Sequence, residues 1–193
     1  MHTYSVNLHE RINVLGALGI FSTLAVWAIQ KYLPDWVPVP SVFALFSGLV
    51  FLFNKWGWRW WICQATFINT PNLNGEWEML TRSSIKKNQD EYKAVLTIKQ
   101  TWTSICLFME GEKTISESVM AGIEVKTDNL FFLKWEYRAE YKPMYAAQNK
   151  IHYGITKVMM RPVSNPEKLE GNYYTDESRD SHGPVTLQRI KKA

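Results

Sequence analysis

The chain has 193 residues, of which 46% are hydrophobic and 21% charged, and a net charge of +4 at pH 7. That length suits one ordinary domain, or a small domain with a second segment. The net charge divides evenly between residues 1–70 and residues 71–193, so neither half is a polycation of the kind that binds long nucleic acids. The two cysteines, Cys63 and Cys106, form neither the disulfide framework of a secreted domain nor a metal-ligand spacing, which favours a reducing compartment.

The stretch from Ile12 to Ile29 contains no charged side chain. A helix of about 18 residues extends about 27 Å, close to the hydrocarbon thickness of a bilayer. The sequence therefore predicts a membrane-spanning helix over about residues 12–30. A cleaved signal peptide is the alternative, but Glu10 precedes the stretch, and no small-x-small cleavage site follows it before Lys31.

A second apolar stretch follows a turn that is rich in proline. Three prolines between Tyr32 and Pro40 prevent the first helix from continuing, because proline lacks a backbone donor. Ser41 is a suitable N-cap residue for the next helix. The apolar residues after it predict a second spanning helix over about residues 40–61.

The segment Lys55–Trp61 (KWGWRWW) separates the apolar part of the chain from the charged part. Tryptophans interleaved with Lys55 and Arg59 are typical of a bilayer interface, and an aromatic core strand is the alternative. Each cation at mid-bilayer would cost about 2.5–3.5 kcal/mol, so we expect both at the interface. Together with Arg11, these two residues place three cations on one side of the predicted membrane, whereas the turn on the other side has Lys31 alone. The two spans predict a multi-pass protein, and the positive-inside rule predicts that its C-terminal domain lies in the cytoplasm.

After Pro71 the pattern changes to short segments with alternating β-branched or aromatic side chains, separated by clusters of Gly, Asn, Asp, Pro and Ser. No segment with helical periodicity lies between them, which argues against a parallel sheet. Eight successive antiparallel strands predict a small closed β-barrel with room for side chains or one small ligand. The predicted strands are Gly75–Thr81, Tyr92–Thr101, Ser104–Glu110, Ser116–Val125, Leu130–Tyr141, His152–Met160, Lys168–Thr175 and Val185–Ile190.

The predicted fold is thus a membrane α-helical hairpin plus an all-β domain. Two N-terminal transmembrane helices occupy residues 1–62, a linker follows over residues 63–72, and an eight-stranded antiparallel β-barrel occupies residues 73–193.

The sequence shows no catalytic constellation. His152 and His182 stand alone, without cysteine or carboxylate at zinc-ligand spacing. The motifs GxxxxGK[ST], GxGxxG and GxSxG of phosphate-binding loops, dinucleotide folds and serine hydrolases do not occur. We therefore expect no catalytic residue, no metal and no cofactor.

Aromatic residues recur together with hydroxyl groups and isolated arginines. This set suits a nucleotide, because aromatic faces stack on bases and arginine forks bind phosphate. For each aromatic residue taken alone, a place in the barrel core is the alternative. The candidates are Trp77, Arg82, Thr101, Trp102, Ser116, Ser118, Tyr137, Arg138, Tyr153, Tyr173, Thr175 and Arg179.

Four stretches in the barrel region resemble the membrane-anchored β-barrel effectors of bacterial cyclic-oligonucleotide anti-phage signalling (CBASS). Leu73–Trp77 (LNGEW) is similar to the LNGxW opening of that barrel, and Ile98–Ile105 (IKQTWTSI) is similar to an IxQTWxxI segment. Ser116–Ser118 resembles a serine-rich strand. Leu169–Thr175 (LEGNYYT) resembles an LEGxYxT strand, which Gly183 follows before the last strand. With the paired apolar spans, the similarity covers nearly the whole chain.

The resemblance implies a receptor without enzymatic activity. A cyclic dinucleotide from a cognate nucleotidyltransferase binds the barrel, and the chains form a homo-oligomer that disrupts the lipid bilayer of the bacterial inner membrane. The outcome is abortive-infection cell death in anti-phage defence. The resemblance also adds Gln100 to the candidate ligand-binding residues as a motif position. Two other classes remain open: a membrane-tethered lipocalin-like barrel that binds a lipid or other apolar molecule, and a hydrolase whose Ser and His meet only in three dimensions.

Overall fold

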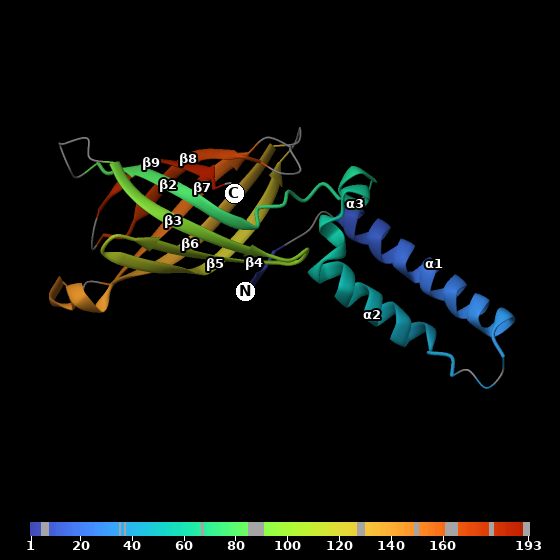
Figure 1. Ribbon diagram of the computed structural model, residues 1–193. Coiled ribbons are helices and arrows are strands. Elements are labelled where there is room, and N and C mark those ends of the chain that lie inside the picture. Colours follow the sequence, from blue (N-terminus) through green and yellow to red (C-terminus); the bar gives the residue numbers. More distant parts are fainter. Residues whose placement is uncertain are drawn as a thin grey trace. The chain divides into compact units, whose positions relative to one another are not determined.

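The computed structural model describes residues 1–4, 8–34, 36, 38–66, 68–84, 91–126, 130–148, 151–160, 166–177 and 180–190. The chain divides into two compact units (Figure 1). The helical unit comprises Val6–Thr70, and the barrel unit combines Met1–Ser5 with Pro71–Ala193. The chain therefore passes between the two units twice.

The helical unit contains α1 (Leu8–Tyr32), α2 (Val42–Lys55), the 3₁₀-helix η1 (Gly57–Arg59) and α3 (Trp61–Thr66). Helix α1 is long and apolar enough to cross a membrane, with a mean hydropathy of 1.9 in its most apolar window. It packs against α2, and most of its large apolar side chains remain exposed. The exposed apolar side chains of α1 and α2 include Ile12, Ile20, Phe21, Leu24, Trp27, Phe43, Phe51 and Leu52.

Helix α2 is shorter than the span predicted for residues 40–61. It begins as expected, because the Ser41 side chain accepts a hydrogen bond from the Ala44 N–H at 3.1 Å. It ends at Lys55, where Trp56 leaves the helical conformation with φ −133°. A helix of 14 residues extends about 21 Å, less than the roughly 30 Å of a bilayer core.

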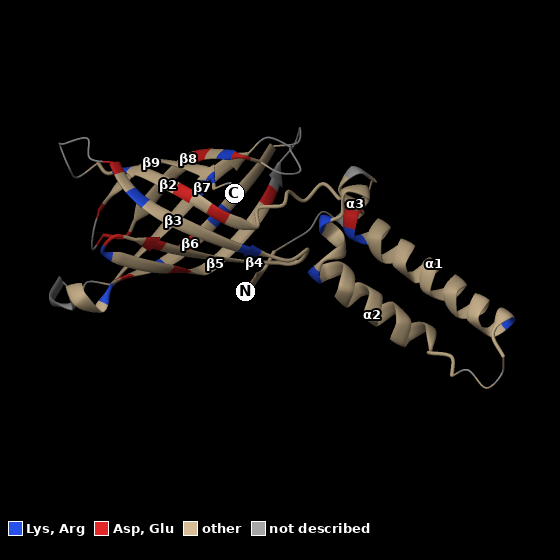
Figure 2. Ribbon diagram, viewed as in Figure 1, with Lys and Arg blue, Asp and Glu red and all other residues tan. Residues whose placement is uncertain are grey.

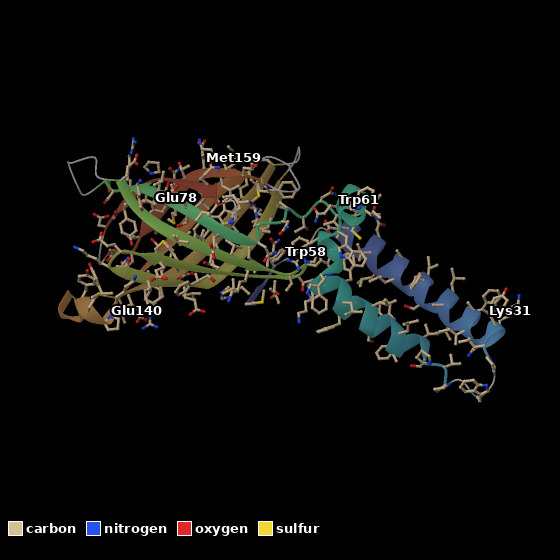
Figure 3. The ribbon with its side chains drawn as sticks, in the orientation of Figure 1. Lys31, Trp58, Trp61, Glu78, Glu140 and Met159 are labelled. Atoms are coloured by element: carbon tan, nitrogen blue, oxygen red, sulfur yellow. The ribbon has the colours of Figure 1, made fainter. Side chains whose placement is uncertain are left out.

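The tryptophans that follow α2 have two kinds of environment. Trp56, Trp60 and Trp61 are exposed, whereas Trp58 in η1 is fully buried. Trp58 and Trp61 are labelled in Figure 3. The Trp58 carbonyl accepts a hydrogen bond from the Gln64 side chain at 2.9 Å. Three of the four indoles are thus available to an interface, and the fourth belongs to the core of the unit.

The barrel unit is a closed antiparallel sheet, which confirms the predicted eight-stranded barrel (Figure 1). Each strand pairs with the next, β2 pairs with β9, and β4 pairs with β5, so the sheet closes on itself. Charged residues are spread over these strands but are scarce along α1 and α2 (Figure 2). The eight strands are β2 (Gly75–Arg82), β3 (Glu91–Gln100), β4 (Ser104–Gly111), β5 (Thr114–Lys126), β6 (Leu130–Tyr141), β7 (His152–Met160), β8 (Lys168–Thr175) and β9 (His182–Arg189).

Side chains alternate between the barrel interior and the solvent, as the two-residue period of a strand requires. Glu78, Glu140 and Met159 are outward-facing positions (Figure 3). The interior half nearest the chain crossings is filled with large apolar side chains, and we call it the base of the barrel. Its fully buried members include Leu73, Trp77, Leu96, Ile98, Trp102, Ile105, Leu107, Leu133, Val158, Leu169 and Leu187.

Three parts of the barrel unit differ from the prediction. Strand β9 begins at His182, although Gly183 and Pro184 indicate a turn. Pro184 pairs with Asn172, and the strand requires the absence of a side chain at Gly183, because any Cβ there would lie 1.9 Å from the Arg82 carbonyl oxygen. The second difference is β1 (His2–Thr3), a short strand that pairs with β4 and that the sequence analysis did not predict. The short 3₁₀-helix η3 (Pro143–Gln148) was also not predicted.

Candidate functional site: a cavity at the open end of the barrel

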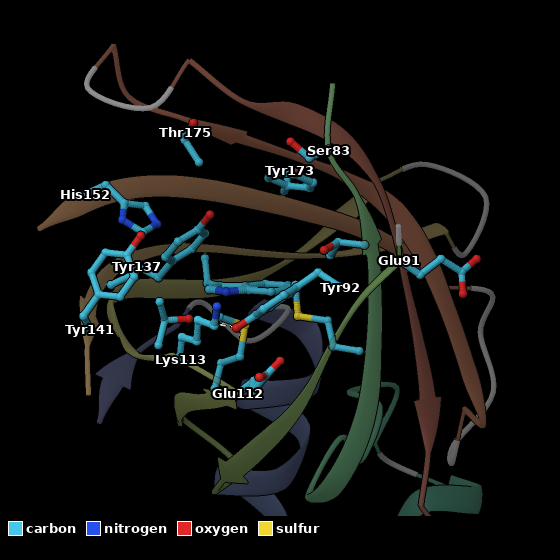
Figure 4. A pocket seen from close by; sticks show the side chains of 16 residues that line it. Ser83, Glu91, Tyr92, Glu112, Lys113, Tyr137, Tyr141, His152, Tyr173 and Thr175 are labelled. Atoms are coloured by element: carbon cyan, nitrogen blue, oxygen red, sulfur yellow. Dashed lines mark hydrogen bonds between the residues drawn. The ribbon is translucent and has the colours of Figure 1, made fainter. Parts of the chain in front are cut away.

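A cavity of about 490 Å³ occupies the end of the barrel opposite to the base (Figure 4). It forms where the closely packed apolar side chains of the base give way to polar residues and to aromatic rings that lie close to the barrel wall. Eight of its sixteen lining residues carry a hydroxyl group, so its wall is rich in donors and acceptors. The lining consists of Met79, Thr81, Ser83, Glu91, Tyr92, Met109, Glu112, Lys113, Thr114, Trp135, Tyr137, Ala139, Tyr141, His152, Tyr173 and Thr175.

Four tyrosines line this cavity: Tyr92, Tyr137, Tyr141 and Tyr173 (Figure 4). The Tyr92 hydroxyl of β3 lies 2.8 Å from the Thr114 hydroxyl of β5, and the Tyr92 side chain passes over Gly111 of the intervening strand β4. Hydrogen bonds of this kind fix the orientation of the rings. Rings held in this way offer flat faces on which nucleobases can stack.

Three of these tyrosines lie beside a glycine of the adjacent, hydrogen-bonded strand. A Cβ on Gly111 would lie 1.6 Å from the Tyr92 hydroxyl oxygen, and a Cβ on Gly154 would lie 2.4 Å from that of Tyr137. A Cβ on Gly183 would lie 3.3 Å from the Tyr173 ring. The glycines therefore allow the rings to lie close to the barrel wall, which keeps the centre of the cavity open.

Ser181 is not part of the cavity lining, but it forms hydrogen bonds with three residues that are. Its hydroxyl lies 3.0 Å from the Tyr173 hydroxyl and 2.9 Å from the Ser83 hydroxyl. Its N–H donates to the Thr175 side chain at 2.7 Å, and its carbonyl accepts from the same hydroxyl at 3.0 Å. Ser181 itself is buried, so one residue of the β8–β9 connection orients three residues of the lining.

Trp135 in β6 supplies a donor at the inner side of the cavity. Its indole is nearly buried, lines the cavity, and has no hydrogen-bond partner among the residues that the structure describes. The neighbouring Thr156, its register partner on β7, also has a buried hydroxyl without a described partner. Thr156 is not part of the lining, so only the Trp135 indole N–H is available to a ligand in the cavity, which would accept a hydrogen bond from it.

The described lining contains both acidic and basic side chains. Glu91 and Glu112 are acidic, Lys113 is basic, and His152 is buried at the start of β7. Arg82 is not part of the lining but pairs with Glu91 at 2.6 Å. Because this ion pair is largely exposed, we expect it to contribute little to stability. The described part of the cavity thus offers aromatic and hydroxyl groups rather than a strongly cationic surface.

Three of the residues predicted from the sequence meet at this cavity. Tyr137, Tyr173 and Thr175 all line it. Ser116 lies next to it, since its register partners Met109 and Ala139 belong to the lining.

Four further candidates lie in the base. Trp77 is fully buried and donates its indole N–H to the Leu73 carbonyl at 3.0 Å. Gln100 and Trp102 are buried as well. The Thr101 hydroxyl lies 2.7 Å from that of Ser104, within the tight β3–β4 connection. The LNGEW and IKQTWTSI stretches therefore build the base of the barrel, as the core alternative for the aromatic residues anticipates.

The remaining candidates lie elsewhere. Ser118 is buried, and its hydroxyl accepts a hydrogen bond from the Leu107 N–H at 3.0 Å. Tyr153 is 43% exposed on the outer face of β7. Arg82 and Arg138 form exposed ion pairs with Glu91 and Glu140, and Arg179 lies outside the described residues.

Sequence reasoning missed most of the lining. Tyr92, Trp135, Tyr141 and His152 were absent from the candidates, although strand alternation places Trp135 and Tyr141 on the same face as Tyr137. That signal was available. The contribution of Tyr92 depends on the pairing of β3 with its neighbours, which no local pattern reveals.

Arg189 in β9 is a residue of the base that was not predicted. Its guanidinium donates to the carbonyls of Asn74 at 2.6 Å and Asn72 at 2.7 Å, and lies 4.4 Å from the centre of the Trp77 ring. Burial lowers the pKa of the Arg189 guanidinium from its ordinary value, and the nearby Glu167 carboxylate partly offsets this. The guanidinium nevertheless stays protonated at neutral pH, and its hydrogen bonds fix the chain where it enters β2.

A small closed barrel with a cavity rich in aromatic and hydroxyl groups defines a class of protein, the barrel domain that binds one small molecule. Residues 68–189 match the family described as Cap15, cyclic dinucleotide receptor domain. The chain belongs to that family, whose ligand is a cyclic dinucleotide and whose members are effectors of CBASS signalling. It is also similar to CD-NTase-associated protein 15 of Yersinia aleksiciae, with 26% identity over 189 residues that cover 93% of this chain and 87% of that protein. Within the described part of the chain, no group of three His, Cys, Asp or Glu residues is placed to hold a metal ion.

Proposed function

We propose that the chain is an effector that binds a cyclic dinucleotide in the barrel cavity and then disrupts the bacterial inner membrane through its helical unit. The signal comes from a cognate nucleotidyltransferase. The observation that carries this proposal is the tyrosine-lined cavity of about 490 Å³ within a cyclic dinucleotide receptor domain. Cavities of roughly 300–1,000 Å³ are typical of small-molecule sites.

The chemistry of the lining suits a cyclic dinucleotide. Tyr92, Tyr137, Tyr141 and Tyr173 offer faces for two bases, and each base stacked on an aromatic ring contributes about 1–3 kcal/mol. Hydroxyl groups and the Trp135 indole N–H are available to base edges, sugars and phosphate oxygens. An apolar ligand such as a lipid would leave the Trp135 indole N–H without a partner, at a cost of about 1–3 kcal/mol.

The helical unit suits a membrane. Phe21, Leu24 and Trp27 of α1 are exposed, as are Phe43 and Phe51 of α2. A water-soluble helix pair would bury such side chains. We infer that α1 spans the bilayer and that α2 extends toward spanning length through Trp56, Trp60 and Trp61, whose indoles suit the membrane interface.

Assembly of several chains links binding to membrane damage in this proposal. One helical hairpin is too small to line an aqueous pore, so disruption requires a homo-oligomer. A ligand shifts an equilibrium toward assembly only by its differential affinity for the assembled form. Tethering to one membrane raises the effective concentration of the chains.

The full chain reconstituted in dye-filled vesicles of phosphatidylethanolamine and phosphatidylglycerol tests the proposal. Addition of cyclic di-AMP, cyclic di-GMP or cyclic di-UMP should release dye with at least one of them, and the matching linear dinucleotide should not. If an apolar ligand raises the melting temperature of the chain and no cyclic dinucleotide releases dye, the result would support a lipocalin-like barrel and contradict the proposal.

A further inference from the structure

The wall of the barrel is incomplete without the first residues of the chain. Strands β4 and β5 pair only between residues 108–110 and 115–117. The first part of β4 instead pairs with β1, His2 with Ile105 and Thr3 with Ser104. Residues 1–4 therefore take part in closing the wall, although the whole helical unit separates them from the other strands in sequence.

Side chains hold this N-terminal strand in its place. The His2 imidazole Nε2 lies 2.7 Å from the Ser118 carbonyl oxygen and 3.0 Å from the Ser118 hydroxyl. The Tyr4 N–H donates to the Thr103 carbonyl at 3.0 Å, and the Tyr4 hydroxyl donates to the Thr101 carbonyl at 3.0 Å. Tyr4 is buried as part of the core, so the segment is docked and not merely adjacent.

Gln100 joins the two places where the chain leaves and re-enters the barrel unit. Its side-chain N–H₂ donates to the Tyr4 hydroxyl and to the Pro71 carbonyl, each at 3.0 Å. Its side-chain carbonyl accepts from the Leu73 N–H at 2.8 Å. One buried amide thus fastens the segment before the helical unit to the segment after it.

Glu10 does the same within the helical unit. Its carboxylate accepts hydrogen bonds from the Asn69 N–H at 3.0 Å and from the Thr70 hydroxyl at 3.1 Å. Glu10 is buried in the first turn of α1, and Asn69 and Thr70 are the last residues of the unit. The beginning and the end of the helical unit are therefore fastened together as well.

We propose that Gln100 and Glu10 are positioning residues of a double connection, through which both chain crossings carry the ligand signal from the barrel to the helices. This inference rests on the proposed membrane function. A single flexible linker transmits little orientation, whereas hydrogen-bonded segments and rigid elements carry coupling between sites. The coupling through the N-terminal crossing is the part that can be broken without altering the cavity.

An insertion of six Gly and Ser residues between Ser5 and Val6 tests this directly in the full chain. It leaves β1 free to dock and leaves every cavity residue unchanged. We expect the same cyclic dinucleotide-induced melting shift as in the wild type, but at least a tenfold lower rate of dye release from vesicles. The matched control is the same insertion after Ala193, which should leave both quantities unchanged.

Two substitutions at Glu10 provide a second measurement. Glu10→Gln keeps a carbonyl acceptor for the Asn69 N–H and should retain most of the dye release. Glu10→Leu removes both hydrogen bonds and should reduce release by at least tenfold while the ligand-induced melting shift stays unchanged. A general packing role would not produce rescue by glutamine.

The outcomes separate this inference from the proposed function. If the wild type releases dye on addition of ligand and the insertion variant releases it equally fast, the double connection is overturned and the proposed function stays intact. Failure of the wild type to release dye contradicts the proposed function, and the coupling claim with it. Ligand-dependent release that the Ser5–Val6 insertion abolishes, with binding retained, supports both.

Discussion

The two ends of the barrel use the same alternating strands for opposite purposes. At the base, Trp77, Gln100 and Trp102 fill the interior, and Trp77 and Gln100 bond to backbone carbonyls and N–H groups. At the open end, glycines such as Gly111 and Gly154 leave room for tyrosines at the wall, and a cavity remains. The comparison teaches that an inward aromatic residue indicates a ligand site only where its neighbours leave space.

Substitutions in the base should affect stability and leave ligand affinity unchanged. Trp77→Ala removes a fully buried indole and its hydrogen bond to Leu73. We expect a loss of about 3–5 kcal/mol in the free energy of unfolding, measured by denaturant titration of the full chain in detergent. The exposed Tyr174→Ala should change stability by less than about 0.5 kcal/mol. Equal losses for the two variants would contradict the division between base and surface.

Substitution of a glycine that lies beside a cavity tyrosine should lower the affinity for the ligand. In Gly111→Ala the new methyl group meets the far end of the Tyr92 side chain, which must swing away and lose its bond to Thr114. We expect affinity for the activating cyclic dinucleotide to fall about tenfold, roughly 1.4 kcal/mol, by calorimetric titration. Gly122→Ala is the matched control, because its Cβ would be 4.0 Å from the nearest atom, on Tyr4. Unchanged affinity in Gly111→Ala would exclude Tyr92 from the site.

The smallest expected effect concerns one hydrogen bond. Trp135→Phe keeps an aromatic ring in the lining and removes the indole N–H that lacks a described partner. If the ligand accepts from this N–H, affinity should fall by about 0.5–1.5 kcal/mol. The apo protein should lose little stability, since no described hydrogen bond is broken. An unchanged dissociation constant would place the ligand away from Trp135.

Much of the fold could be predicted from the sequence, because alternation and turn residues are local signals. Lys168–Thr175 and His152–Met160 were predicted with the bounds that the structure has. The site was harder, since membership of the cavity depends on pairing between distant strands. Tyr153 and Tyr137 look alike in sequence, yet one faces solvent and the other the cavity.

Other features had no local signal at all. The docking of β1 depends on a gap between β4 and β5 that only the closed sheet creates. The buried role of Gln100 depends likewise on the return of the chain at Pro71 and on Tyr4. A motif marks such residues as important but does not distinguish a hydrogen bond to the backbone from one to a ligand.

The central claim, that the cavity is the ligand site, is tested most directly by one pair of variants. Tyr137 and Tyr153 lie on neighbouring strands, where Tyr137 pairs with Gly154 and lines the cavity while Tyr153 faces solvent. The measurement is the melting temperature of the full chain in detergent, with and without the activating cyclic dinucleotide. We expect Tyr153→Ala to keep the wild-type shift and Tyr137→Ala to lose most of it, through an affinity loss of about 1–3 kcal/mol. A full shift in Tyr137→Ala, or its loss in Tyr153→Ala, would contradict the account.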